Sequence, residues 1–113
     1  MDTTAATTRS PVDEPILRSL KGELERLYGD RLERVLLFGS RARGDARPDS
    51  DWDVAVFLRG YDGNREEVSR LSDLGFDLMM ETGIGLSLKL FAPGELTERT
   101  LFMHNLRRDG IEL

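Results

Sequence analysis

Two aspartates, Asp51 and Asp53, stand two positions apart in a stretch with the pattern of a β-strand. Successive side chains of a strand point to opposite faces, so both carboxylates point the same way, with Cβ atoms about 7 Å apart. Two carboxylates this close repel each other unless a cation lies between them. A hard divalent ion such as Mg²⁺ is the natural partner of such oxygen ligands. The pair therefore predicts a metal site.

A glycine and a serine, Gly39 and Ser40, end an apolar run, and ten residues separate Ser40 from the first of these acids. Glycine allows the backbone to turn tightly and to approach a ligand closely. Exposed backbone amides at a turn from strand to helix suit a phosphate group, and the Ser40 hydroxyl adds one more donor. The turn therefore predicts a phosphate-binding site.

Positive charge gathers beside this turn although the chain as a whole is acidic. Three arginines lie within seven residues: Arg41, Arg43 and Arg47. We expect Arg41 and Arg43 to bind phosphate, with pairing to the nearby Asp45 and Asp49 as the alternative role. Ser50 is a further candidate for the phosphate or metal site, and a role in the turn or at the start of the strand is equally open. Together these segments describe a site for a nucleoside triphosphate and Mg²⁺.

The spacing Gly39-Ser40, ten residues, Asp51-x-Asp53 resembles the signature of the DNA polymerase beta-like nucleotidyltransferase superfamily. The short chain, the run GSRARG and the Ser50-Asp51 pair look like its smallest branch, the minimal nucleotidyltransferases. Members of this branch are the antitoxin halves of two-protein modules whose toxins are HEPN-domain proteins. The resemblance covers most of residues 15–113, and its specific part is residues 38–56.

The resemblance implies an enzyme that transfers a nucleotidyl group from a triphosphate, usually ATP, to a hydroxyl and releases pyrophosphate. In the antitoxin branch the acceptor is a tyrosine of the toxin. Gly39 and Ser40 would hold the β- and γ-phosphates, and Arg41 or Arg43 would stabilise the charge that develops on the pyrophosphate.

The resemblance also assigns Mg²⁺ to Asp51 and Asp53, with one ion on the triphosphate and a second on the attacking oxygen. A third carboxylate normally completes this site from the next strand. That strand, residues 86–91, offers Ser87 and Lys89 and no acid. We therefore expect a two-ion site that is incomplete without a partner or substrate.

Two alternatives stay open. The chain could be a catalytically weak or degenerate antitoxin that acts by forming a complex. It could instead be the catalytic subunit of a two-chain transferase that acts on RNA or a small molecule. A chain of 113 residues has room for the triphosphate half of a transferase and little for the acceptor half, so a hetero-oligomer is expected.

Composition excludes several other classes of protein. The length predicts one domain. The absence of cysteine excludes a disulfide scaffold and a Cys-ligated metal. No apolar run approaches the roughly 20 residues of a membrane-spanning helix, and the N-terminus has no signal-peptide pattern, so a cytoplasmic protein is expected. A net charge of −5 weighs against direct nucleic-acid binding.

Hydrophobic spacing predicts the elements that position the motif. Residues 1–14 have the composition of a flexible tail, and residues 15–113 form the single nucleotidyltransferase domain. Leucines at three- and four-residue steps predict a helix from Pro15 that ends near Gly29. Strands are expected at 35–38, 51–58 and 86–91, a loop at 39–50, and further helices at 65–81 and 95–105.

The order of these elements predicts an α/β (α+β) fold, with a small mixed β-sheet and helices packed mainly on one face. Alternation along residues 51–58 places Trp52 on the face opposite the two acids, packed against a helix. In the last predicted helix we expect Leu96, Leu101 and Phe102 to point inward. Beyond Gly110 only a short apolar end remains.

Overall fold

The computed structural model describes Pro11 and residues 14–113, so most of the predicted tail at residues 1–14 lies outside the described residues. The elements follow in chain order: α2 (Pro15–Tyr28), η2 (Gly29–Arg31), β1 (Leu32–Phe38), α3 (Ser40–Arg43), β2 (Trp52–Leu58), α4 (Arg65–Thr82), β3 (Leu86–Phe91), η3 (Pro93–Thr97), α5 (Leu101–Asp109) and β4 (Ile111–Glu112). The elements η2 and η3 are 3₁₀ helices.

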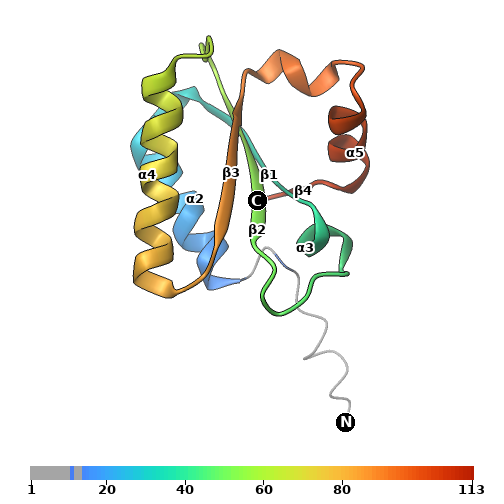
Figure 1. The fold of residues 1–113 in the computed structure, drawn as a ribbon. Helices are drawn as coiled ribbons and strands as arrows, with labels where there is room; N and C mark the ends of the chain where they lie inside the picture. The colour runs from blue at the N-terminus through green and yellow to red at the C-terminus, as the bar shows by residue number, and fades with distance from the viewer. Residues whose placement is uncertain (1–10, 12–13) are drawn as a thin grey trace.

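The strands form one four-stranded sheet in the order β3-β2-β1-β4. Strand β1 runs antiparallel to β2 and to β4, whereas β2 and β3 are parallel. Helices α2 and α4 lie together on one side of the sheet and α5 lies on the other side, while the short α3 follows the end of β1 (Figure 1). The predicted mixed sheet with helices mainly on one face is confirmed, and α5 adds a smaller cover on the second face.

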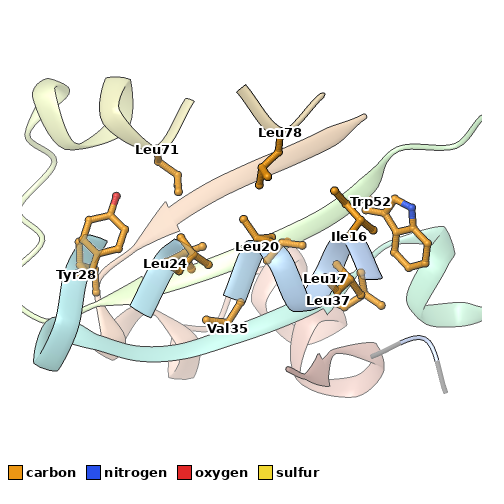
Figure 2. Packing of buried hydrophobic residues seen from close by; sticks show 13 residues of the cluster. Ile16, Leu17, Leu20, Leu24, Tyr28, Val35, Leu37, Trp52, Leu71 and Leu78 are labelled. Carbon is orange, nitrogen blue, oxygen red and sulfur yellow. The ribbon is translucent and has the colours of Figure 1, made fainter. Parts of the chain in front are cut away.

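The larger core lies between the sheet and helices α2 and α4, on what we call the α2–α4 face. Helix α2 begins with Pro15 at its first turn and ends at Gly29, whose φ is +55°. In between, Leu20 and Leu24 are fully buried. They pack with Leu37 of β1 and with residues of α4 (Figure 2). The predicted amphipathic helix is confirmed with its limits.

Strand β2 begins at Trp52, one residue after the predicted start at Asp51, and has the predicted alternation. Trp52 and Val54 belong to the larger core, whereas Ala55 and Phe57 belong to a second cluster with Met103 of α5. We call this second side of the sheet the α5 face. Because period two is kept along the strand, the side chain of Asp53 projects from the α5 face.

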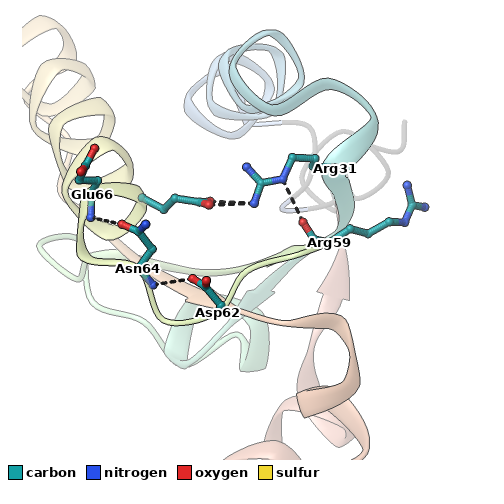
Figure 3. A network of polar contacts seen from close by, with 6 residues as sticks. Arg31, Arg59, Asp62, Asn64 and Glu66 are labelled. Atoms are coloured by element: carbon teal, nitrogen blue, oxygen red, sulfur yellow. Dashed lines mark hydrogen bonds and ion pairs between the residues drawn. The ribbon is translucent and has the colours of Figure 1, made fainter.

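Polar contacts away from Asp51 and Asp53 fix the other end of β2. Arg31 donates from Nε to the carbonyl of Arg59 at 2.9 Å and from Nη2 to Glu67 at 2.8 Å (Figure 3). The Asn64 side chain accepts the N–H of Glu66 at 2.7 Å and caps α4. This network sets where α4 begins relative to the sheet.

The predicted helix at 95–105 is wrong, because two short helices occupy this part of the chain. The Glu95 carboxylate accepts the N–H of Ala92 and closes the 3₁₀ turn η3. The backbone is then extended at Glu98 and Thr100, and the Thr100 hydroxyl accepts the N–H of Met103 to begin α5. Consequently Leu101 lies at the first position of α5 and is 76% exposed, not inward.

Smaller differences concern lengths. Strand β1 begins at Leu32, three residues before the predicted start, and the predicted loop at 39–50 contains the single helical turn α3. The apolar end forms β4, in which Ile111 lies opposite Leu37. Within the part of the chain that the structure describes, no helix is long and apolar enough to cross a membrane.

Candidate functional site

The turn at Gly39 and the carboxylate of Asp53 are in direct contact. Gly39 has φ +75° and ψ −158°, a combination that is essentially restricted to glycine. A Cβ atom at Gly39 would overlap Oδ2 of Asp53 and lie 3.2 Å from its Cγ. The carbonyl of Gly39 accepts the N–H groups of Ala42 and Arg43 at 3.1 Å, which starts α3 with Ser40 as its first residue. The predicted phosphate turn and metal ligand therefore touch each other.

The second carboxylate rests on a second glycine. A Cβ atom at Gly85 would overlap Oδ1 of Asp51 and lie 3.0 Å from its Cγ. The carbonyl of Gly85 accepts the N–H of Trp52 at 3.0 Å, which joins the start of β2 to the residue before β3. Gly85 thus leaves the space that Asp51 occupies. Sequence reasoning missed it, since its only signal was a small residue just before a strand.

The surroundings of Asp53 disfavour its negative charge. Partial burial raises the pKa of this carboxyl above its ordinary value, and the charge of Asp51 raises it further. The charges of Lys89 and Arg43 and a hydrogen bond from Ser87 lower the pKa in part. The two aspartates therefore repel each other, as the sequence predicted, and a cation between them would relieve the repulsion.

These two carboxylates fit one divalent ion bound through oxygen atoms. Among the described residues, no group of three or more histidine, cysteine, aspartate or glutamate side chains is arranged to hold a metal ion. Strand β3 places Ser87 opposite Asp53 in the parallel register. Asp77 and Glu81 lie on the α2–α4 face, beside residues of α2, and so cannot complete the pair.

Arg41 is engaged with the protein itself. Its guanidinium donates to the carbonyl of Ser50 at 2.8 Å and to that of Pro48 at 3.2 Å. It also lies 4.5 Å from the centroid of the Trp52 ring. Trp52 is buried against the helices as predicted. With these contacts Arg41 holds residues 44–50 against the start of β2, and its binding to phosphate stays a prediction.

The remaining motif residues divide between the site and the turn. Arg43 forms an exposed ion pair with Asp45 at 3.3 Å, and its charge acts on Asp53. The hydrogen bond from Arg108 lowers the pKa of Asp109, and the charge of Arg43 lowers it further. Asp109, which belongs to the closing Arg-Asp-Gly-Ile run of the sequence, was not among the predicted site residues.

Ser50 closes the turn before β2. Its hydroxyl accepts the N–H of Arg47 at 2.9 Å, and its own N–H donates to the Arg47 carbonyl at 3.0 Å. This is the turn role that the sequence left open for Ser50.

Separate substitutions of the two arginines should have different effects. Arg41→Met removes three hydrogen bonds to backbone carbonyls and a contact with Trp52, and should lower the free energy of unfolding by about 1–2 kcal/mol. Arg43→Met should leave the melting temperature nearly unchanged and weaken ATP binding by about tenfold. Thermal melts and ATP titrations of both variants check this. Equal losses of stability would contradict it.

Two neighbouring hollows open on the α5 face. One, of about 230 Å³, is bordered by Gly39, Arg43 and Phe102. The other, of about 410 Å³, is bordered by Lys89, Phe91 and Phe102. Because Phe102 borders both, a ligand in the first would lie beside a ligand in the second.

Comparisons with family models and with known proteins point to the same family. Residues 17–97 match the family model described as "Nucleotidyltransferase domain". The chain is 41% identical over 98 residues to "Putative protein adenylyltransferase MJ0141" of Methanocaldococcus jannaschii, covering 87% of this chain and 95% of that protein. It is 30% identical over 95 residues to "Putative protein adenylyltransferase MJ1305" of the same organism, covering 80% of this chain and 65% of that protein.

The fold also has solved counterparts. A chain in a crystal structure described as a toxin-antitoxin with AMP-PNP superposes with a TM-score of 0.59. The match covers 83% of this chain and 69% of that chain at 20% sequence identity. The predicted nucleotidyltransferase-like fold is thereby confirmed.

Proposed function

Because this chain belongs to the nucleotidyltransferase domain family, we propose that it transfers AMP from ATP to a hydroxyl group of a partner protein. The contact between the Gly39 turn and the Asp53 carboxylate carries this proposal. A phosphate held at the turn lies next to a cation held by Asp51 and Asp53. Adjacent phosphate and cation sites are what nucleotidyl transfer from a triphosphate requires.

The reaction has a simple balance. The acceptor oxygen attacks the α-phosphorus of ATP and forms a new P–O bond. The bond from that phosphorus to the oxygen that bridges it to the β-phosphorus breaks, and pyrophosphate leaves. The hydroxyl proton passes to solvent. When bound, Mg²⁺ would neutralise phosphate charge and orient the triphosphate.

The chain's own residues supply the rest. Amides of the turn at Gly39 and Ser40, together with the Ser40 hydroxyl, would bind the terminal phosphates. Arg43 is the arginine whose charge acts on Asp53, so it would stabilise the leaving pyrophosphate. Asp51 and Asp53 would hold the ion. Arg41 and Ser50 would support the site by fixing the loop.

For the acceptor, we propose a tyrosine of a HEPN-type toxin, with the chain acting in the cytoplasm as the antitoxin in a hetero-oligomer. Two relatives are named as protein adenylyltransferases, and a solved chain of this fold belongs to a toxin-antitoxin structure with AMP-PNP. The second hollow supports an aromatic acceptor, because Phe91, Phe102 and Met103 border it and such side chains pack well against a phenol ring.

Incubation of the protein with α-labelled ATP, Mg²⁺ and the partner protein with which it copurifies tests the activity. We expect label on the partner, on tyrosine by mass spectrometry, and none with γ-labelled ATP. No label on the partner in either Mg²⁺ or Mn²⁺ would rule out the transferase.

One observation favours a second function, neutralisation of the partner by complex formation alone. Strand β3 places Ser87 and Lys89 beside Asp53, where a further acid would strengthen metal binding. The double variant Asp51→Asn, Asp53→Asn separates the two functions. If it still forms the complex but no longer neutralises the toxin, binding alone is insufficient.

A further inference from the structure

Lys89 lies on the same face of the sheet as the aspartate pair. In the parallel register of β2 and β3, Asp53 lies opposite Ser87 and Ala55 lies opposite Lys89. Residues two apart on a strand share a face, so Lys89 projects from the α5 face beside the small, fully buried Ala55. The neighbour of Lys89 across the strand pair is therefore a residue whose side chain is only a methyl group.

Lys89 is also part of the lining of the second hollow. Lys89 borders this hollow together with Phe91 and Phe102, and its charge is felt at Asp53. Lys89 therefore borders the place proposed for the acceptor side chain and lies close enough to the place proposed for the metal ion for its charge to act there.

The charges near Asp53 leave room for one divalent ion. Asp51 and Asp53 carry two negative charges, which one divalent ion balances. A second divalent ion on the β3 side would meet the Lys89 ammonium at close range without a third carboxylate to offset the repulsion. Many transferases place two divalent ions about 3.5–4 Å apart to stabilise both the attacking and the leaving oxygen.

We propose that Lys89 supplies the second positive charge of the site, so that the reaction uses one divalent ion together with one lysine. The ammonium donates to the acceptor oxygen as negative charge develops on it, while the ion on Asp51 and Asp53 serves the triphosphate. This inference rests on the proposed function for the role of Lys89 in transfer, but its prediction about metal binding can be measured without any transfer.

The number of bound Mn²⁺ ions tests it. Mn²⁺ replaces Mg²⁺ at oxygen sites and is counted by electron paramagnetic resonance as it is titrated into the protein without nucleotide. We expect one bound ion in the wild type and two in Lys89→Glu, where an added carboxylate replaces the ammonium. The chain has one other lysine, Lys21 on α2, and Lys21→Met should still bind one ion.

Any count other than one in the wild type, or an unchanged count in Lys89→Glu, overturns the inference. If Lys89→Glu does not fold, Ser87→Asp adds an acid directly opposite Asp53 and should give the same count of two. The ion count involves no transfer reaction, so it can succeed even if the partner-labelling experiment fails. Likewise, labelling of the partner can succeed even if the ion count differs from the expected one.

Steady-state kinetics of Lys89→Met, which removes the charge of Lys89, give a second test of its role. Lys89→Met should lower kcat for partner modification at least tenfold while KM for ATP changes less than threefold, as expected for a group that acts on the acceptor oxygen in the transition state. The rate of this variant should depend on Mg²⁺ more steeply than that of the wild type. An unchanged kcat overturns the catalytic role of Lys89.

Discussion

Asp53→Asn is expected to abolish AMP transfer, by about 10³-fold or more, and at the same time to raise the melting temperature at neutral pH. Loss of a metal ligand removes several kcal/mol of transition-state stabilisation, and each 1.4 kcal/mol corresponds to about tenfold in rate. The gain in stability has a separate cause, because the folded protein disfavours the charge that this carboxylate carries.

The sign of that gain follows from the pKa of Asp53. Burial and the charge of Asp51 raise this pKa in the folded state above its value in the unfolded chain. The stability that the group contributes is therefore fully present below the unfolded pKa, about 3.9, and is lost as the pH rises through the folded pKa. At pH 7 the wild type lacks this contribution, whereas the asparagine variant has no charge to disfavour.

Thermal melts at pH 3 and pH 7, combined with the labelling reaction, check both effects. The difference in melting temperature should be present at pH 7 and vanish at pH 3. Asp49→Asn removes an exposed acid from the neighbouring loop and should change neither activity nor stability. An Asp53→Asn protein that retains a tenth of the activity, or that melts lower at pH 7, would contradict the assignment.

Gly39→Ala is expected to lower transfer by about 10²-fold, because the added Cβ would displace the Asp53 carboxylate. Such displacement of a ligand by about 1 Å commonly costs this much. The backbone at Gly39 also lies where non-glycine residues are strained, so the variant should lose about 1–3 kcal/mol of stability. Labelling rates and thermal melts measure the two losses.

A second glycine separates strain from displacement. Gly63, in the turn before α4, has φ +89°, and among the described residues no atom beyond its chain neighbours lies within 4 Å of the point where a Cβ would stand. Gly63→Ala should therefore lose stability through strain alone and keep its transfer rate. If both variants lose activity in proportion to stability, the contact between Gly39 and Asp53 has no specific role.

The parts of the fold that depend on local pattern could be predicted from the sequence. Leucine spacing and Gly29 define α2, and the alternation along β2 places Asp53 and Trp52 on opposite faces. The contact between Gly39 and Asp53 needs more than local pattern, because it depends on the antiparallel pairing of β1 with β2, which places Phe38 opposite Asp53.

The parts that depend on register between distant segments could not be predicted. The place of Gly85 beside Asp51 is set by the pairing of β2 with β3. The predicted helix at 95–105 failed for a local reason, because a glutamate and a threonine each close a backbone turn within it. Glu95 after Pro93 and Thr100 before Leu101 are capping signals that the apolar spacing concealed.

The hydrogen bonds from Arg41 to the loop before Asp51 have a consequence for ligand binding. With its guanidinium on the carbonyls of Pro48 and Ser50 and over Trp52, the segment that leads to Asp51 is already ordered before a nucleotide arrives. The conformational entropy of that segment is given up during folding, so it does not weaken the affinity for the nucleotide. Through its contacts with the protein alone, Arg41 can in this way favour the binding of a nucleotide.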